Sequence, residues 1–111
     1  MSAPLNLSVV VPLYNEEESL HHLVEQLLSA LRPTEETFEL VLVDDGSSDR
    51  TANVLAQLSA EVPEVVAVLL RKNYGQTAAM AAGFDVAGGE VIVSLDGDCL
   101  LYTSPSPRDT A

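Results

Sequence analysis

Two aspartates separated by one glycine, Asp96 and Asp98, are the residues of this 111-residue chain whose spacing best suits chemistry. They follow the apolar run Val91–Leu95, which is typical of a buried strand. Glycine lets the backbone bend and leaves space, so both carboxylates can turn toward one point beyond the strand. Oxygen ligands in that arrangement suit Mg²⁺ or Mn²⁺, which would in turn hold the phosphates of a substrate. The alternative is an ordinary Asp-Gly-Asp turn that binds no metal.

Two other apolar runs also end in polar residues that could bind a ligand. Leu7–Leu13 is short, apolar and rich in valine, as expected of a strand buried on both faces, and it leads into Tyr-Asn-Glu at 14–16. Phe38–Val43 has the same character and leads into Asp-Asp-Gly-Ser-Ser-Asp at 44–49. A further strand is predicted at Val65–Leu70, so three of the four predicted strands end in a polar cluster.

Amphipathic spacing predicts a helix after the first strand. We expect Asn15 to be its N-cap, Glu16–Glu18 to occupy its first turn, and Pro33 to end it. The apolar residues of this segment recur at i, i+3, i+4, i+7, i+8 and i+11, which places them on one face of a helix. These residues are Leu20, Leu23, Val24, Leu27, Leu28 and Leu31.

Two shorter helices are predicted between the later strands. The first of them is capped by Ser47 or Ser48, has Asp49 in its first turn, and buries an apolar stripe between Thr51 and Val62. The other covers 77–86 and is rich in alanine, so it can lie close to a sheet.

The resulting βαβαβαβ order predicts a three-layer, Rossmann-like α/β fold. Short connections of this kind require a mostly parallel sheet with right-handed crossovers and helices on both faces. In such sheets ligands bind beyond the carboxyl ends of the strands, where the strand order reverses. With the strand order 3-2-1-4, the ends of the first, second and fourth strands would line a single crevice.

Charge and motifs narrow the class of ligand. The net charge of −12 and the pI near 4.1 come without a basic stripe, which argues against nucleic acid as a partner. The first strand–helix turn lacks G-x-G-x-x-G and the chain lacks a P-loop, so dinucleotide binding and P-loop chemistry are disfavoured. Carboxylates at the strand ends need a cation before a phosphate can approach them, and a nucleoside diphosphate with a divalent metal meets that need.

Five segments, in this order, resemble the motifs of family 2 glycosyltransferases with the GT-A fold: 10–16 (VVPLYNE), 43–49 (VDDGSSD), 71–76 (RKNYGQ), 82–84 (AGF) and 96–98 (DGD). The likeness is greatest to the branch that transfers a sugar to a polyprenyl phosphate, such as dolichol-phosphate mannosyltransferase and its bacterial relatives. It extends from Leu7 to Asp98, and it implies a GT-A nucleotide-binding half with strand order 3-2-1-4.

The resemblance also implies a nucleotide-sugar site, made by Pro12, Tyr14, Glu16, Val43, Asp45, Arg71 and Asp96. Within it, Val43 and Asp45 would reach the base and ribose, and Arg71 would approach the nucleotide or its diphosphate. Asp96 and Asp98 would hold Mg²⁺ or Mn²⁺ on the diphosphate. The resemblance assigns no catalytic residue in this chain.

The end of the chain differs in character from the rest. The run 99–109 has no periodicity and resembles the conceptual translation of a transposase adaptor used in shotgun sequencing. We therefore interpret 1–98 as the N-terminal part of a truncated GT-A domain and 99–111 as a non-native tail, and leave the tail out of the predicted fold. The acceptor-side residues would then lie outside this chain, and the fragment itself would be inactive.

These features lead us to expect a metal-dependent enzyme that transfers a sugar from a nucleotide-diphosphate sugar to a polyprenyl phosphate. The chain contains no apolar run near the ~20 residues of a membrane span. We place it in the cytoplasm, with the full-length parent at the cytoplasmic face of the membrane in cell-envelope synthesis. One alternative is a non-catalytic nucleotide-sugar-binding domain. Another is a receiver-like signalling domain, although receivers carry their acidic pair after the first strand, where this chain has Leu13, Tyr14 and Asn15.

Overall fold

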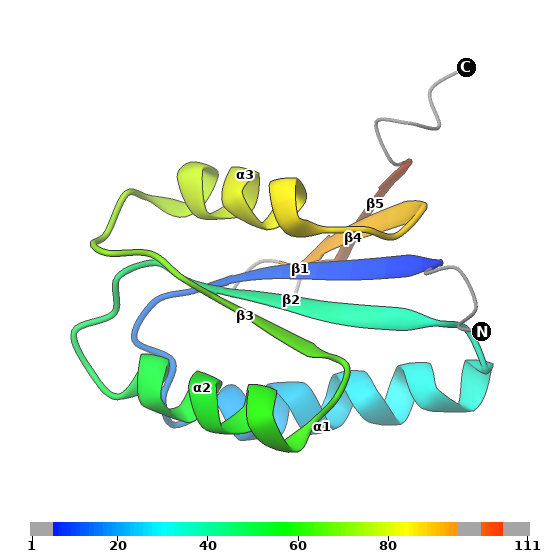
Figure 1. Ribbon diagram of the computed structural model, residues 1–111, viewed down its shortest axis with the longest axis horizontal. Helices are drawn as coiled ribbons and strands as arrows, with labels where there is room; N and C mark the ends of the chain where they lie inside the picture. The colour runs from blue at the N-terminus through cyan, green and yellow to red at the C-terminus, as the bar shows by residue number, and fades with distance from the viewer. Residues whose placement is uncertain (1–5, 96–100, 106–111) are drawn as a thin grey trace.

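A five-stranded sheet lies between helices on both of its faces in the computed structural model, which describes residues 6–95 and 101–105 (Figure 1). Apolar, β-branched runs form its inner strands, because strands buried on both faces need side chains without polar atoms. The strands are β1 (Leu7–Leu13), β2 (Phe38–Asp44), β3 (Val65–Leu69), β4 (Val91–Leu95) and β5 (Leu101–Pro105).

The first four strands are parallel and lie in the order β3-β2-β1-β4, which confirms the predicted order. Leu7 at the start of β1 pairs with Phe38 of β2 and with Val91 of β4. These three strands therefore begin at the same end of the sheet and run in the same direction. The order differs from the 2-1-3-4-5 order of flavodoxin-like receivers, so the receiver alternative is wrong.

The fifth strand was not part of the predicted fold, which left out residues 99–111. In the structure β5 pairs antiparallel with β4, and Pro105 lies opposite Val91. The free edge of β4 offers unpaired N–H and C=O groups to any extended segment. The link 96–100 is too short for the crossover that a parallel strand needs, so the pairing is antiparallel.

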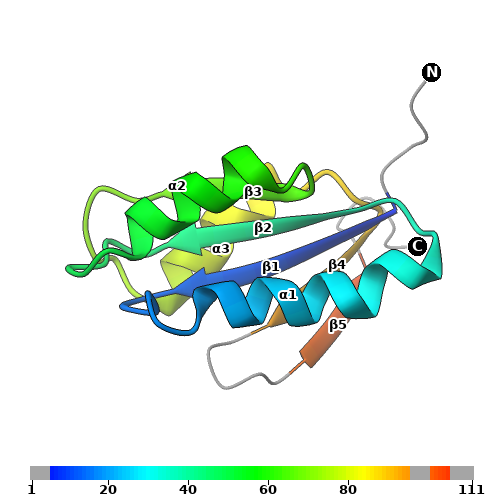
Figure 2. The ribbon, with the colours of Figure 1, turned by 90° about the horizontal axis from the view of Figure 1, so that it is seen from below.

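Helices α1 (Leu20–Leu31) and α2 (Thr51–Glu61) cover one face of the sheet, and α3 (Gln76–Val86) covers the other (Figures 1 and 2). The sheet therefore separates two cores, to which alternate strand residues contribute. The larger core packs against α1 and α2 and includes Val9, Val11, Leu20, Val24, Leu40, Leu42 and Leu55. The smaller core lies beneath α3 and includes Val10, Val41, Val43, Ala79, Ala87 and Ile92.

Small residues on α3 allow it to lie close to the sheet, as its alanine content predicts. Ala79 is fully buried, and Gly83 faces β1 so closely that a Cβ atom there would overlap the side chain of Val10. The same atom would also lie 3.1 Å from the Val43 side chain. A larger residue at Gly83 would force α3 away from both strands.

The predicted start of the first helix is wrong. Its N-cap is Ser19 instead of Asn15, and Glu16–Glu18 precede the helix instead of forming its first turn. Asn15 has a left-handed backbone, with a φ of 54°, and its side chain bonds to Ser48 from the next loop. That long-range bond takes up the oxygen that an N-cap would have turned toward the helix.

The predicted cap of α2 is also wrong. The hydroxyls of Ser47 and Ser48 do not cap this helix, whose first residue is Thr51. The N-cap is Arg50, and Asp49 precedes the helix instead of lying in its first turn as predicted. The Oδ1 of Asp49 accepts hydrogen bonds from both the backbone N–H and the hydroxyl of Thr51, at 2.9 and 2.5 Å. These bonds hold the pKa of Asp49 below its ordinary value.

A surface ion pair joins the end of α1 to the start of β3. Arg32 lies in the short 3-10 helix η1 (Arg32–Thr34), and its guanidinium donates two hydrogen bonds to the carboxylate of Glu64, at 3.1 and 3.2 Å. This hydrogen bonding holds the pKa of Glu64 below its ordinary value and raises that of Arg32.

Within 6–95 and 101–105, no helix has the length and apolar character needed to cross a bilayer.

The ion pair predicts a pH dependence of stability. Because the pKa of Glu64 is lower in the folded protein than in the unfolded chain, its stabilising contribution is present above the unfolded pKa and is lost as the pH falls through the folded pKa. We expect Glu64→Gln to lower the melting temperature slightly at pH 7, since Arg32 is half exposed, and this difference to shrink as the pH falls below the ordinary pKa of a glutamate. Thermal melts across this range measure the difference, with Glu18→Gln as an exposed control. A difference that does not change with pH would contradict the assignment.

Candidate nucleotide-binding site

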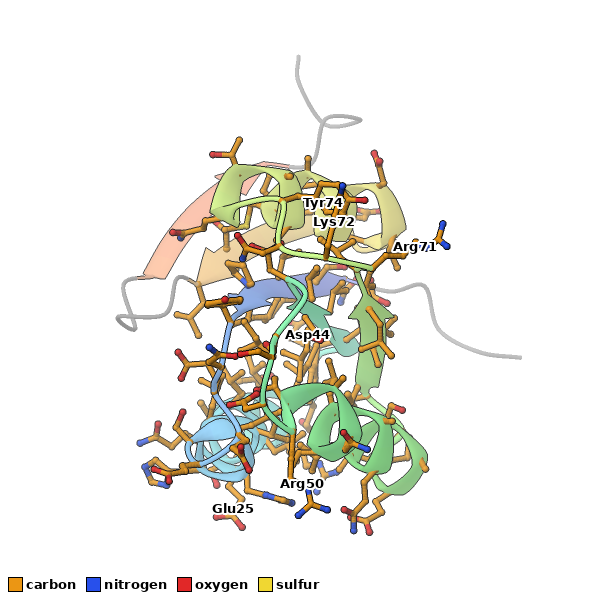
Figure 3. The ribbon with its side chains drawn as sticks, turned by 90° about the vertical axis from the view of Figure 1, so that its left-hand side faces the viewer. Glu25, Asp44, Arg50, Arg71, Lys72 and Tyr74 are labelled. Carbon is orange, nitrogen blue, oxygen red and sulfur yellow. The ribbon has the colours of Figure 1, made fainter. Side chains whose placement is uncertain are left out.

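Three loops meet beyond the carboxyl ends of β1, β2 and β3, at the end of the molecule that faces the viewer in Figure 3. They cover 14–19, 45–50 and 70–75, and each links a strand to the following helix. Parallel pairing brings the loops together, because strands that run in one direction all end at the same edge. This edge is the position at which the sequence predicts a ligand.

A cavity of about 140 Å³ opens at this edge between the first two loops and the start of α3. The cavity is lined by Pro12, Leu13, Tyr14, Glu16, Asp45 and Gln76. Four of these residues were predicted for the nucleotide-sugar site, and the structure brings all four together. The Tyr14 side chain is half exposed, whereas Asp45 is almost completely buried.

The two aspartates that follow one another at the end of β2 point to opposite faces of the sheet, as successive strand residues do. The Oδ1 of Asp44 accepts hydrogen bonds from the backbone N–H of Ser47 in the second loop, at 3.2 Å, and from the Ser47 hydroxyl. That hydroxyl oxygen in turn accepts a hydrogen bond from the backbone N–H of Asn15, at 2.8 Å. Asp44 thereby ties the loops after β1 and β2 together.

Asp45 turns toward α3 and the loop after β3. Its Oδ1 accepts a hydrogen bond from the backbone N–H of Tyr74 at 2.9 Å. Its Oδ2 accepts from the backbone N–H of Gly75 at 3.1 Å and from the side-chain amide of Asn73 at 3.0 Å. Three N–H donors thus fill most of the hydrogen-bonding capacity of this buried carboxylate. These bonds make it a poor metal ligand.

Further hydrogen bonds join the first two loops. The side-chain oxygen of Asn15 accepts from the backbone N–H of Ser48, at 2.9 Å, and from its hydroxyl, at 3.3 Å. The backbone N–H of Glu16 donates to the hydroxyl of Thr51 at 2.8 Å, so the pocket residue Glu16 is held by the start of α2. Sequence reasoning did not select Thr51 for this task, because its partner lies 35 residues away.

Two predicted residues do not reach the cavity. Val43 is fully buried in the core beneath α3, because it lies on the face of β2 opposite Asp44. Arg71 is exposed, and its side chain projects outward beside the end of β3 (Figure 3). Its neighbour Lys72 places its ammonium group 5.5 Å from the centre of the Tyr74 ring, a cation–π contact at the rim of the site.

The predicted metal ligands Asp96 and Asp98 lie outside the described residues. Strand β4 runs parallel to β1 and ends at Leu95, so its carboxyl end points toward the same side of the sheet as the carboxyl end of β1. In the part of the chain that the structure describes, no cluster of three or more histidine, cysteine or acidic residues could hold a metal.

Comparison with known proteins agrees with this geometry. The family model described as glycosyl transferase family 2 matches residues 8–104. The undecaprenyl-phosphate 4-deoxy-4-formamido-L-arabinose transferase of Pectobacterium carotovorum is 52% identical over 105 residues, which cover 93% of this chain and 32% of the relative. The Pseudomonas fluorescens protein of the same name is 50% identical over 103 residues, which cover 92% and 30%. The chain thus spans about a third of the length of the curated relatives it matches.

Solved structures with the same arrangement are GT-A glycosyltransferases. The mannosyltransferase PcManGT of Pyrobaculum calidifontis, in complex with GDP-Man and Mn²⁺, has a TM-score of 0.74 and 25% identity over 86% of this chain and 30% of its own. TarS 1–349 of S. aureus, in complex with UDP, has a TM-score of 0.72 and 29% identity over 85% of this chain and 28% of its own. The predicted GT-A fold is confirmed.

The left-handed backbone of Asn15 predicts different effects for two substitutions. Asn15→Gly removes the bonds to Ser48 but tolerates the positive φ, so we expect a loss of about 1 kcal/mol of unfolding free energy, as for one hydrogen bond. Asn15→Ala loses the same bonds and adds strain, so we expect a further loss of about 1–2 kcal/mol. Urea denaturation measures both. Equal stability of the two variants would show that the backbone strain is absent.

Proposed function

The chain belongs to glycosyl transferase family 2, and we propose that it supplies the donor-nucleotide half of an enzyme that transfers a sugar from a nucleotide-diphosphate sugar to a polyprenyl phosphate. The observation that carries the proposal is the meeting of Pro12, Tyr14, Glu16 and Asp45 around one cavity at the carboxyl edge of the sheet. Ligands of doubly wound α/β folds bind at this edge. The names of the relatives, which specify undecaprenyl phosphate, support the class of acceptor.

The cavity offers chemistry that suits a nucleoside. The half-exposed ring of Tyr14 supplies a flat apolar surface on which a base can stack. An ionised carboxylate has about four places for hydrogen-bond donors, and three of those on Asp45 are already filled. The fourth remains for an N–H group of the base. Val43 contributes from within the core, by fixing the end of β2.

The diphosphate needs a cation at this edge, because the carboxylates of Glu16 and Asp45 line the cavity. We assign the binding of Mg²⁺ or Mn²⁺ to Asp96 and Asp98, whose hard oxygen ligands suit these ions. When bound, the metal neutralises charge on the diphosphate leaving group. The exposed guanidinium of Arg71, in the third loop, would have to reorient to approach the nucleotide or diphosphate.

The remaining parts of the reaction belong to the longer protein of which we propose 1–98 to be the N-terminal part, with 99–111 as a non-native tail. Its acceptor-side residues and catalytic base would lie beyond this chain, which would then be inactive alone. We place the parent at the cytoplasmic face of the membrane, where a polyprenyl phosphate meets water-soluble nucleotide sugars. A non-catalytic nucleotide-sugar-binding domain would bind the donor without transferring the sugar.

The proposal predicts that metal and nucleotide bind together. Two carboxylates form an incomplete coordination shell, so Mn²⁺ should bind much more tightly when UDP or GDP supplies further oxygen ligands. We expect Asp98→Ala to weaken this binding by about tenfold or more, because even residues that only support metal ligands contribute that much. Calorimetric titration of Mn²⁺ with and without each nucleotide tests this, with Asp85→Ala on α3 as the control. Weak binding that neither the nucleotide nor Asp98→Ala changes would contradict the site.

Stacking on Tyr14 gives a second test of the same pocket. Tyr14→Phe keeps the ring, so nucleotide affinity should change little. Tyr14→Ala removes the ring and should cost about 1–3 kcal/mol, the usual contribution of a base stacked on an aromatic side chain. Binding of UDP and GDP in the presence of Mn²⁺ measures both variants. If Tyr14→Ala binds as tightly as the unchanged protein, the base does not occupy this cavity.

A further inference from the structure

The carboxylate of Asp45 is held by the protein's own loop, which gives it a second task beside the base contact. We propose that Asp45 and Asn73 form a latch that fixes the turn 73–75 before α3 and so presets the wall of the nucleotide pocket. In this role Asp45 is a positioning residue that acts through the turn. The effect of the latch on nucleotide binding rests on the proposed function, whereas the latch itself rests on contacts in the structure.

The latch joins the ends of β2 and β3 through three oxygen atoms of Asp45. The side-chain amide of Asn73 donates to the backbone carbonyl of Asp45 at 3.1 Å and to its Oδ2 at 3.0 Å. The backbone N–H groups of Tyr74 and Gly75 complete the set of donors. Since Asp45 is only 3% exposed, water cannot easily replace donors that leave, and opening the turn would strand a buried charge. The turn and the carboxylate therefore depend on each other.

Two glycines allow the latch to close. Gly46 has a φ of 65° and lies so near the third loop that a Cβ atom there would overlap the backbone of Lys72 and Asn73. Gly75 has a φ of 105°, a conformation that other residues rarely adopt, and immediately precedes α3. The backbone of Gly46 thus lies directly against the backbone of Lys72 and Asn73.

The position of the pocket wall follows from the last bond of the latch. Gly75 donates to Oδ2 of Asp45, and the next residue, Gln76, begins α3 and lines the cavity together with Asp45. Asn73 does not line the cavity, so its effect on a nucleotide can only pass through the turn. This separation of roles makes Asn73 the residue that distinguishes a latch from a direct contact.

Amide hydrogen exchange tests the latch without any ligand. We expect the amides of Tyr74 and Gly75 to be protected in the unchanged chain, and to exchange at least about tenfold faster in Asp45→Asn and in Asn73→Ala, which remove acceptor and donor respectively. Asp85→Asn makes the first change at an exposed site on α3 and should leave both amides protected. Protection of other core amides, such as that of Leu42, shows that each variant is folded. Rapid exchange in the unchanged chain, or slow exchange in both variants, would overturn the proposal.

Nucleotide binding then tests the consequence. We expect Asn73→Ala to weaken the binding of UDP or GDP, with Mn²⁺ present, by about fivefold or more, and to add little once Asp45→Asn is in place, because both changes open one latch. Unchanged affinity in Asn73→Ala would overturn the presetting of the pocket. If the unchanged chain binds neither nucleotide, the proposed function fails, while protected Tyr74 and Gly75 amides that both variants expose still establish the latch.

Discussion

The structure of the site depends on two adjacent carboxylates at the end of β2. Alternation along the strand sends the two side chains to opposite faces of the sheet. Asp44 binds Ser47, whose hydroxyl accepts from Asn15 in the loop after β1, and Asp45 binds the loop after β3. Both residues are buried, and N–H and O–H groups of the loops supply the hydrogen bonds that their oxygen atoms require. Hydrogen bonds at the end of β2 thus connect the three loops, and the cavity lies between the first two loops and the start of α3.

This arrangement relies on the position of β2 within the sheet. With β1 on one side and β3 on the other, the end of β2 reaches both neighbouring loops directly. The backbone continues the connection: the N–H of Asp45 donates to Leu13 at 2.8 Å, and the carbonyl of Asp44 accepts from Leu70 at 2.9 Å. The smaller core then fixes the distance of α3 from the sheet, because Gly83 allows the helix to pack directly on Val10. Packing and loop chemistry therefore position the same pocket wall from opposite ends of α3.

The sequence predicted the elements of this fold better than the bonds between them. Periodicity placed the four parallel strands within one residue of their ends, because burial on both faces leaves a run of apolar residues that is easy to recognise. The caps were predicted wrongly, since local preference assigned Asn15 and Ser48 to helix starts, whereas the fold bonds them to each other across 33 residues. Val43 was assigned to the site from a motif and lies in the core, because its face of β2 meets α3. Asn73 was overlooked because its partner is 28 residues away.

A carboxylate that is already bound by its own protein suits a site for an anionic ligand. Without its bonds to the turn, the Asp45 carboxylate would be hydrated and would repel a diphosphate. It would then have to lose its bound water molecules when a nucleobase binds. Three N–H donors spread its charge over the turn and leave one direction open, so binding requires little reorganisation of the loop. The charge that a cation must offset is then concentrated on other carboxylates, of which Glu16 borders the cavity. In the proposed site, recognition of the base and binding of the metal would therefore fall to different carboxylates.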